Sequence, residues 1–270
     1  MPLLEKVYAK CFKSYERIES GLPAAALFDL TGVPVKTFLH RKGRITKENL
    51  WRELCDGASL GHIMCASIGA VDWSSFFSMK VKCAMNDLVN GHAYGLLDAR
   101  ELEDDSGNPI RLLKVRNPWG TFEWKGDWGD ESDLWTDRLK EECDLQVNNN
   151  DGLFWICYDD FLEFFQIIDI CYYQEKYWRT NILVQECAPN KRVLTFRAPE
   201  GVVGKYSFTL SQKDPRLFPR NSDGGNEKPT PYSKMAIWSY EGGEDAFTDF
   251  QFVDGAELFD AHETNLTVQV

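Results

Sequence analysis

The sequence lacks the cysteine pairs of a zinc site or of a disulfide framework. Its eight cysteines are scattered singly, and no CxxC pair occurs. Cys65, Cys157 and Cys171 lie inside apolar runs, which favours reduced, buried thiols and a reducing compartment. No apolar run approaches the roughly 20 residues that cross a membrane, and the N-terminus has no signal-peptide pattern. We therefore expect a soluble, cytoplasmic protein without a transmembrane segment.

Positive charge is also scarce. The chain has 30 Lys and Arg against 42 Asp and Glu, a net charge of −12. This balance argues against nucleic acid and anionic membranes as main partners and is compatible with a bound cation. Hydrophobic residues make up 43% of the 270 residues and aromatic residues 13%, which is enough for a sizeable core.

The hydrophobic pattern changes near residues 174–180, where we place a domain boundary. Before it, helical spacing predicts a helix over about 3–19 and another from an N-cap at Thr46 to Gly57. Strands are predicted over 59–71, 80–85, 92–103, 110–117 and 152–161. Residues 158–169 fit either a short helix, capped by Asp159 or Asp160, or a continued strand.

After the boundary the pattern is that of short alternating strands separated by turn residues. These runs are 181–186, 192–198, 205–212, 234–241, 248–254 and 265–270, with a polar loop over 219–233. Such spacing is typical of an antiparallel β-sandwich. The last strand ends the chain without a polar tail, so we expect the sandwich to be incomplete. The predicted class is α+β: an antiparallel sheet with a few helices over 1–175, then a sandwich over 176–270.

Two polar residues stand at the edges of apolar runs that form a candidate hairpin. They are His92 in NGHAYGLL and Asn117 in KVRNPWGTFEW. The midpoint between them falls between Asp104 and Asp105, at the start of the turn-rich EDDSGNP. A hairpin there would place His92 beside Asn117 at its open end, with a bulge shifting the register by a residue or two. The Asn amide oxygen could then hold one imidazole N–H and leave the other nitrogen free as a base.

Spacing alone leaves a structural alternative open. A lone histidine is more often an ordinary structural residue, and an Asn-Pro pair usually starts a turn.

Several longer motifs resemble the second half of the calpain protease core. They are PLLEKVYAKCFKSYERIESG, ALFDLTG, GHAYGLLDA, LLKVRNPWGTFEWKGDWGD and NDGLFWICYDDFLEFF, spread over residues 2 to about 172. The resemblance implies a papain-like half-domain that supplies part of a Cys–His–Asn site. The later strands resemble, by position and texture, the β-sandwich domain that follows the calpain core.

The resemblance assigns roles to three residues. His92 matches the general base, Asn117 the residue that orients it, and Trp119 the tryptophan that shields the pair from water. The alternative for Trp119 is plain core packing, which is compatible with the shielding role.

The family's cysteine nucleophile opens a helix in a first half-domain that has no match here. Three cysteines of this chain are poor substitutes. Cys11 is expected in the middle of a helix on its apolar face, and Cys65 falls in a segment that resembles a buried strand of the family. Cys83 is expected on a strand beside His92, but neither a helix start nor oxyanion donors accompany it.

The resemblance also implies calcium. Glu123 and Asp130 match acidic ligands of one calcium loop, Asp151 matches one in a second loop, and Asn149 stands where a backbone carbonyl binds. The family's second acid in the later loop is replaced by Leu153, which should weaken the site. These acids could instead be solvated turn residues.

We therefore expect a calpain-like, calcium-dependent cysteine endopeptidase that cuts protein substrates. This chain would supply His92 and Asn117 but not the nucleophile, and would be inactive alone. The first half would come from the same natural polypeptide or from a partner chain. The alternative is a pseudoprotease that acts as a calcium- or protein-binding module. A transglutaminase-like acyl-transferase fits less well, since it needs Asp at position 117.

Overall fold

The computed structural model describes residues 2–40, 45–69, 73–145, 151–173, 205–211, 214–217, 234–239, 251–257 and 263–269. The chain forms two compact units. One is Leu22–Gln174, and the other combines Met1–Gly21 with Glu175–Val270. The domain limits expected from the sequence, 1–175 and 176–270, stay a prediction.

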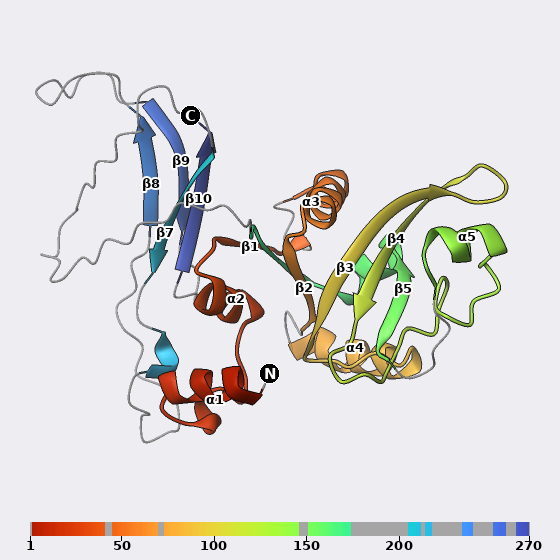
Figure 1. Ribbon diagram of the computed structural model, residues 1–270, viewed down its shortest axis with the longest axis horizontal. Helices are drawn as coiled ribbons and strands as arrows, with labels where there is room; N and C mark the ends of the chain where they lie inside the picture. Colours follow the sequence, from red (N-terminus) through yellow and green to blue (C-terminus); the bar gives the residue numbers. More distant parts are fainter. Residues whose placement is uncertain are drawn as a thin grey trace, which may run out of the picture. The chain divides into compact units, whose positions relative to one another are not determined.

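The unit Leu22–Gln174 is built on one six-stranded antiparallel sheet (Figure 1). Its strand order is β1-β6-β2-β3-β4-β5. The strands are β1 (Val35–Phe38), β2 (Ile63–Ile68), β3 (His92–Glu103), β4 (Pro109–Arg116), β5 (Leu153–Cys157) and β6 (Ile167–Cys171). Together with the helices, this sheet confirms the predicted α+β class.

Three helices cover the face of the sheet that carries the main core. They are α3 (Lys47–Ser59), α4 (Trp73–Met85) and α6 (Tyr158–Phe164). Leu54 of α3 and Phe161 of α6 are fully buried in the same cluster as Leu113 of the sheet. As predicted, α3 begins after Thr46, whose side chain accepts a hydrogen bond from the Asn49 N–H at 3.2 Å. The ambiguous segment 158–169 is a helix followed by a strand.

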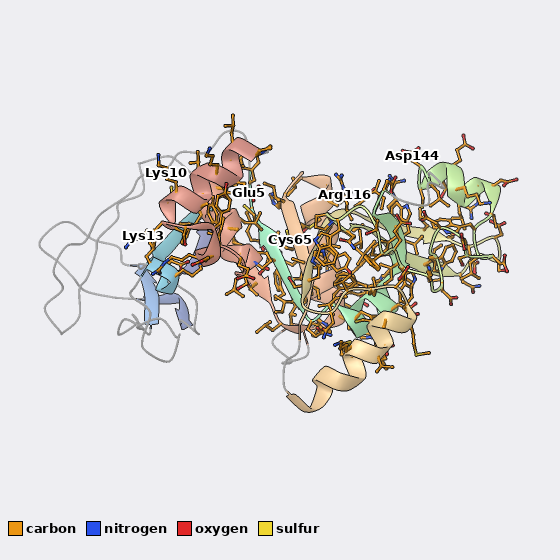
Figure 2. The ribbon with its side chains drawn as sticks, turned by 90° about the horizontal axis from the view of Figure 1, so that it is seen from below. Glu5, Lys10, Lys13, Cys65, Arg116 and Asp144 are labelled. Atoms are coloured by element: carbon orange, nitrogen blue, oxygen red, sulfur yellow. The ribbon has the colours of Figure 1, made fainter. Side chains whose placement is uncertain are left out.

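The opposite face of the sheet is covered in two separate places. Alternation along β4 sends Leu113 to the main core and Leu112 to this face, where it packs with Trp155 below α5 (Asp137–Glu142). At the other end, α2 (Pro23–Thr31) packs over β1 and β6. Between them, Cys65 and Arg116 lie on either side of Gly95 in the strand register (Figure 2). Local sequence pattern did not predict α2, α5 or β1.

Two predicted elements were wrong. The helix expected over 3–19 is α1 (Pro2–Cys11) followed by a separate 3₁₀ turn, η1 (Tyr15–Arg17), because Lys13 has φ 77° and cannot continue the helix. The strand expected over 80–85 is the last part of α4. Its buried Met79 and Cys83 are four residues apart on one helical face, a spacing that a short apolar run does not separate from strand alternation.

In the other unit the described strands form two antiparallel pairs. β7 (Lys205–Ser211) pairs with β10 (Glu263–Gln269), and β8 (Lys234–Ser239) pairs with β9 (Gln251–Glu257). These confirm four of the predicted strands. The strands expected over 181–186 and 192–198 and the loop over 219–233 lie outside the described residues. A short 3₁₀ turn, η3 (Pro215–Leu217), places Arg216 over the Phe12 ring at the end of α1.

Within the described ranges, no helix has the length and apolar character needed to cross a membrane.

Candidate active site

The β3–β4 hairpin brings His92 and Asn117 into contact. Gly95 faces Arg116, and a bulge at Leu97 shifts the pairing so that Asp98 faces Lys114. Extending the register of Gly95 and Arg116 places Asn117 opposite position 94, two residues from His92, a shift within the range expected from the sequence. The His92 Nε2 and Asn117 Oδ1 atoms are 2.9 Å apart.

The Asn117 side chain is fully buried and uses its whole hydrogen-bonding capacity. Its Nδ2 donates to the carbonyl oxygens of Thr121 (2.6 Å) and Phe122 (3.2 Å), so the amide nitrogen must lie on that side. Its Oδ1 accepts from the Trp119 N–H at 3.1 Å and faces His92. An amide oxygen can only accept, so Nε2 carries a proton, and in the neutral imidazole Nδ1 keeps its lone pair. Within the described part of the chain, Nδ1 has no hydrogen-bond partner.

Two aromatic rings hold the imidazole. The Trp119 ring centroid lies 4.3 Å from that of His92, tilted by 41°, and the Tyr94 ring meets it edge-on at 5.0 Å. Tyr94 is buried, and its hydroxyl accepts from the Val89 N–H at 2.8 Å, which ties the ring to the turn before β3. Trp119 remains 60% exposed, so it covers the His–Asn pair from one side and presents its other face outward.

The backbone around Asn117 depends on special conformations. Asn117 N–H donates to the Gly152 carbonyl at 2.7 Å, which extends the β4–β5 ladder by one pair. Gly152 has φ 79°, and a side chain there would collide with the Asn117 carbonyl and lie 2.9 Å from Gly120 Cα. Phe122 also has a positive φ, 63°, which is costly for a residue with a side chain.

Two of the predicted calcium ligands, Asp130 and Glu123, have raised pKa values, and the charge of the third, Asp151, is one of the causes. Burial, then the charges of Glu123 and Asp151, raise the pKa of Asp130 to about 7. Burial also raises the pKa of Glu123, against the effect of a hydrogen bond from the Gly152 N–H at 2.8 Å. The Asp130 Oδ2 atom is buried without a hydrogen-bond partner.

The remaining predicted ligand cannot be placed. Asn149 lies outside the described residues. Leu153, which replaces a family acid, begins β5, and its N–H donates to Asp151 Oδ1 at 2.8 Å. In the part of the chain that the structure describes, no group of three acidic, histidine or cysteine side chains is arranged to hold a metal ion.

Six of the seven described cysteine thiols are not activated. Burial raises the pKa of Cys55, Cys65, Cys83 and Cys143 to about 11 and that of Cys157 to about 12, and it also raises that of Cys171. At neutral pH these groups remain thiols, which are poor nucleophiles. Cys83 lies in the core on α4, not on a strand beside His92 as expected.

Sequence reasoning missed the residues that support the pair. Tyr94 was part of an apolar run, and nothing in its spacing distinguished it from other core positions. Gly152 and Gly120 carried a signal, because glycines beside an Asn-Pro-Trp and an Asn-rich run mark tight turns. That these two turns lie against each other follows only from the pairing of β4 with β5.

A model of the calpain family of cysteine proteases matches residues 1–172. The chain belongs to the calpain family. That membership also agrees with the six-stranded α+β unit.

Curated relatives from animals and plants agree with this family. Calpain clp-1 of Caenorhabditis elegans is 36% identical over 175 residues, which is 63% of this chain and 21% of the relative. The rat (Rattus norvegicus) calpain-1 catalytic subunit is 34% identical over 171 residues, 63% of this chain and 23% of the relative. The calpain-type cysteine protease DEK1 of Arabidopsis thaliana is 34% identical over 174 residues, 63% of this chain and 8% of the relative. The matched region is thus under a quarter of these calpains.

Proposed function

We propose that this chain supplies the general base and its orienting residue to a calpain-like cysteine endopeptidase acting on protein substrates. The observation that carries the proposal is the hydrogen bond of 2.9 Å between His92 Nε2 and a fully buried Asn117. It leaves the His92 Nδ1 lone pair as the available base. Membership of the calpain family of cysteine proteases supports the reaction class.

In the proposed reaction His92 first accepts a proton and then donates the same proton. Nδ1 first takes the proton of a cysteine thiol, and the thiolate attacks the substrate carbonyl carbon. The resulting imidazolium then gives that proton to the leaving amine as the peptide bond breaks, and water later releases the acyl group from sulfur. Asn117 keeps the second proton on Nε2 throughout, and Trp119 limits the access of water to this hydrogen bond.

The nucleophile in this proposal comes from another segment, of the same polypeptide or of a partner chain. Burial disfavours the thiolate at six described cysteines, which supports this division of roles.

Calcium binding is part of the proposal. Glu123, Asp130 and Asp151 would hold the ion together with Asn149, which would contribute its backbone carbonyl. Because the three acids are not arranged as a metal site in this structure, binding would require their side chains to draw together. Two observations fit such a group. Burial and the charges of Glu123 and Asp151 raise the pKa of Asp130, and the buried Asp130 Oδ2 atom has no hydrogen-bond partner. A cation would offset the repulsion between the acids and bind this oxygen. When bound, calcium would neutralise this acidic cluster and fix its loops. Loss of an acid at Leu153 predicts weak affinity.

Reconstitution tests the catalytic proposal. The nucleophile-bearing half of the Caenorhabditis elegans relative is added to this chain, and cleavage of a flexible protein substrate is measured with and without calcium. We expect His92→Ala to abolish cleavage and Asn117→Ala to reduce it by about a hundredfold or more, because the tautomer and orientation of the base are lost. The control is His62→Ala, which removes a histidine bonded to the Tyr173 carbonyl elsewhere in the sheet unit.

A reconstituted enzyme that keeps full activity in His92→Ala would refute the assignment. If no cleavage appears with a half that is active in its own context, the second candidate gains support: a calpain-like module that binds protein without cutting it. The six unactivated thiols already favour that reading for this chain alone.

A further inference from the structure

The loop that carries Glu123 is closed around the Asn117 side chain. It leaves β4 at Asn117, turns at Gly120, and returns its Thr121 and Phe122 carbonyls to the Asn117 Nδ2 group. One residue later, the Glu123 carboxylate accepts a hydrogen bond from the Gly152 N–H. Gly152 in turn accepts from the Asn117 N–H. Both ends of the loop, Asn117 and Glu123, are therefore hydrogen-bonded to Gly152.

This arrangement forms a short, continuous path to the proposed base. It runs from Glu123 Oε1 to Gly152 N (2.8 Å), from the Gly152 carbonyl to Asn117 N (2.7 Å), and from Asn117 Oδ1 to His92 Nε2 (2.9 Å). We propose that Glu123 is a positioning residue for the His92–Asn117 pair, acting through Gly152, in addition to its proposed part in binding calcium. This inference rests on the proposed function, since it concerns the same pair.

The hydrogen bond from the Gly152 N–H to Glu123 has the features of a structural constraint and not of an incidental contact. Its acceptor is a carboxylate, which forms a stronger bond to an N–H than a neutral oxygen does. It also closes a loop that contains the left-handed Phe122, a conformation that persists only where its surroundings enforce it. The Phe122 carbonyl is one of the two acceptors that fix the Asn117 amide. Without Glu123, Phe122 can relax and the amide loses its fixed orientation.

The lack of space around Gly152 makes the path rigid. A side chain at this position would meet the Asn117 carbonyl and Gly120, so the two turns are packed backbone against backbone. A displacement of Gly152 therefore moves Asn117. A cation that binds Glu123 would act on the same carboxylate that holds Gly152, so its effect on His92 would pass through these residues.

Two substitutions of Glu123 separate its hydrogen bond from its charge. Glu123→Gln keeps an oxygen that can accept from the Gly152 N–H but removes the charge, whereas Glu123→Ala removes both. The matched control is Asp130→Asn, which changes a neighbouring acid of the same cluster that makes no described hydrogen bond to Gly152. The full 270-residue chain is labelled with ¹⁵N and studied in chelator at pH 8, and His92→Ala identifies the His92 signals among the four histidines.

Two readouts report on the path without any protease activity. The imidazole ¹⁵N shifts of His92 give its tautomer, and hydrogen exchange gives the protection of the Asn117 and Gly152 amides. We expect wild type and Asp130→Asn to show the Nε2–H tautomer and protected amides. Glu123→Gln should keep the tautomer with slightly less protected amides, because a neutral oxygen accepts more weakly than a carboxylate. In Glu123→Ala we expect a mixture of tautomers and about tenfold faster exchange of both amides, the effect of losing the charge-assisted hydrogen bond to the Gly152 N–H.

Three outcomes would overturn the inference. They are wild-type behaviour of Glu123→Ala, equal damage in Glu123→Gln, and equal damage in Asp130→Asn. If Glu123→Ala does not fold, the wild type and Glu123→Gln still decide, because unprotected Gly152 and Asn117 amides in either would show that no such constraint exists. All of these results are independent of reconstituted proteolysis, so this inference and the proposed function can fail separately.

Discussion

At the scale of single residues, Asp130 shows how the fold alters an ordinary side chain. Its carboxylate is partly buried beside Glu123 and Asp151, and these causes raise its pKa to about 7 from 3.8. A carboxyl group whose pKa is raised by folding binds more protons in the folded chain than in the unfolded chain. The free energy of unfolding therefore falls as the pH rises from about 4 through about 7.

Asp130→Asn should remove this pH-dependent penalty. In chelator we expect little difference from wild type near pH 4. Near pH 8 we expect a gain of about 1–2 kcal/mol in the free energy of unfolding, a figure reduced because solvent screens the partly exposed Asp130 carboxylate. Urea denaturation across this pH range measures it. The control is Asp137→Asn, at an exposed acid of α5 whose charge is not among the causes of the Asp130 shift. A gain that is the same at pH 4 and pH 8 would contradict the assignment of the shift to Asp130.

At the scale of elements, the site depends on two turns that pack against each other, one at Gly120 after β4 and one at Gly152 before β5. A glycine outside these turns, Gly107, serves for comparison. Gly152 and Gly107 both have left-handed backbones, with φ 79° and 81°. They differ in their surroundings: nothing lies within 4 Å of a Cβ at Gly107, whereas a Cβ at Gly152 would strike the Asn117 turn. Alanine substitutions at the two glycines therefore separate the effect of close packing on stability from the effect of backbone conformation.

Gly107→Ala should cost about 1 kcal/mol of stability, the ordinary penalty of a left-handed alanine. Gly152→Ala should cost at least about 2 kcal/mol more, since backbone atoms of Asn117 and Gly120 must move. Thermal or urea unfolding of both variants checks this. Equal losses in the two variants would mean that the turns are not as tightly packed as described.

At the scale of the whole molecule, the acidic balance and the acid cluster predict stabilisation by calcium. A ligand that binds only the folded chain raises the free energy of unfolding, by about 1.4 kcal/mol at ten times its dissociation constant. We expect a rise in melting temperature at millimolar calcium. Glu123→Ala combined with Asp130→Ala should abolish this rise, whereas Asp137→Ala in α5 should not.

Magnesium at the same concentration is the ionic control for this measurement, because it adds the same charge but fits carboxylate and carbonyl loops less readily. No rise with calcium, or an equal rise in the double variant, would show that the proposed loops do not bind the ion in this chain.

Much of the fold could be read from local pattern. β3, β4 and α3 were predicted at nearly their observed positions, because alternation, helical spacing and an N-cap are carried by neighbouring residues. The segment 80–85 was misread because a short apolar run fits both periods. The 3–19 helix was too long because the left-handed Lys13 has no strong local signal. These errors mark places where packing, and not propensity, decides the element.

The sequence by itself determined the calpain resemblance, the hairpin and the meeting of His92 with Asn117, since a tight hairpin makes register a local property. Only the tertiary structure decided which imidazole nitrogen carries the proton, because that depends on where the Asn117 amide finds acceptors. It also decided the raised pKa of Asp130 and the path from Glu123 through Gly152. Those depend on β5 lying against β4, a contact between segments far apart in the chain whose pairing no local pattern specifies.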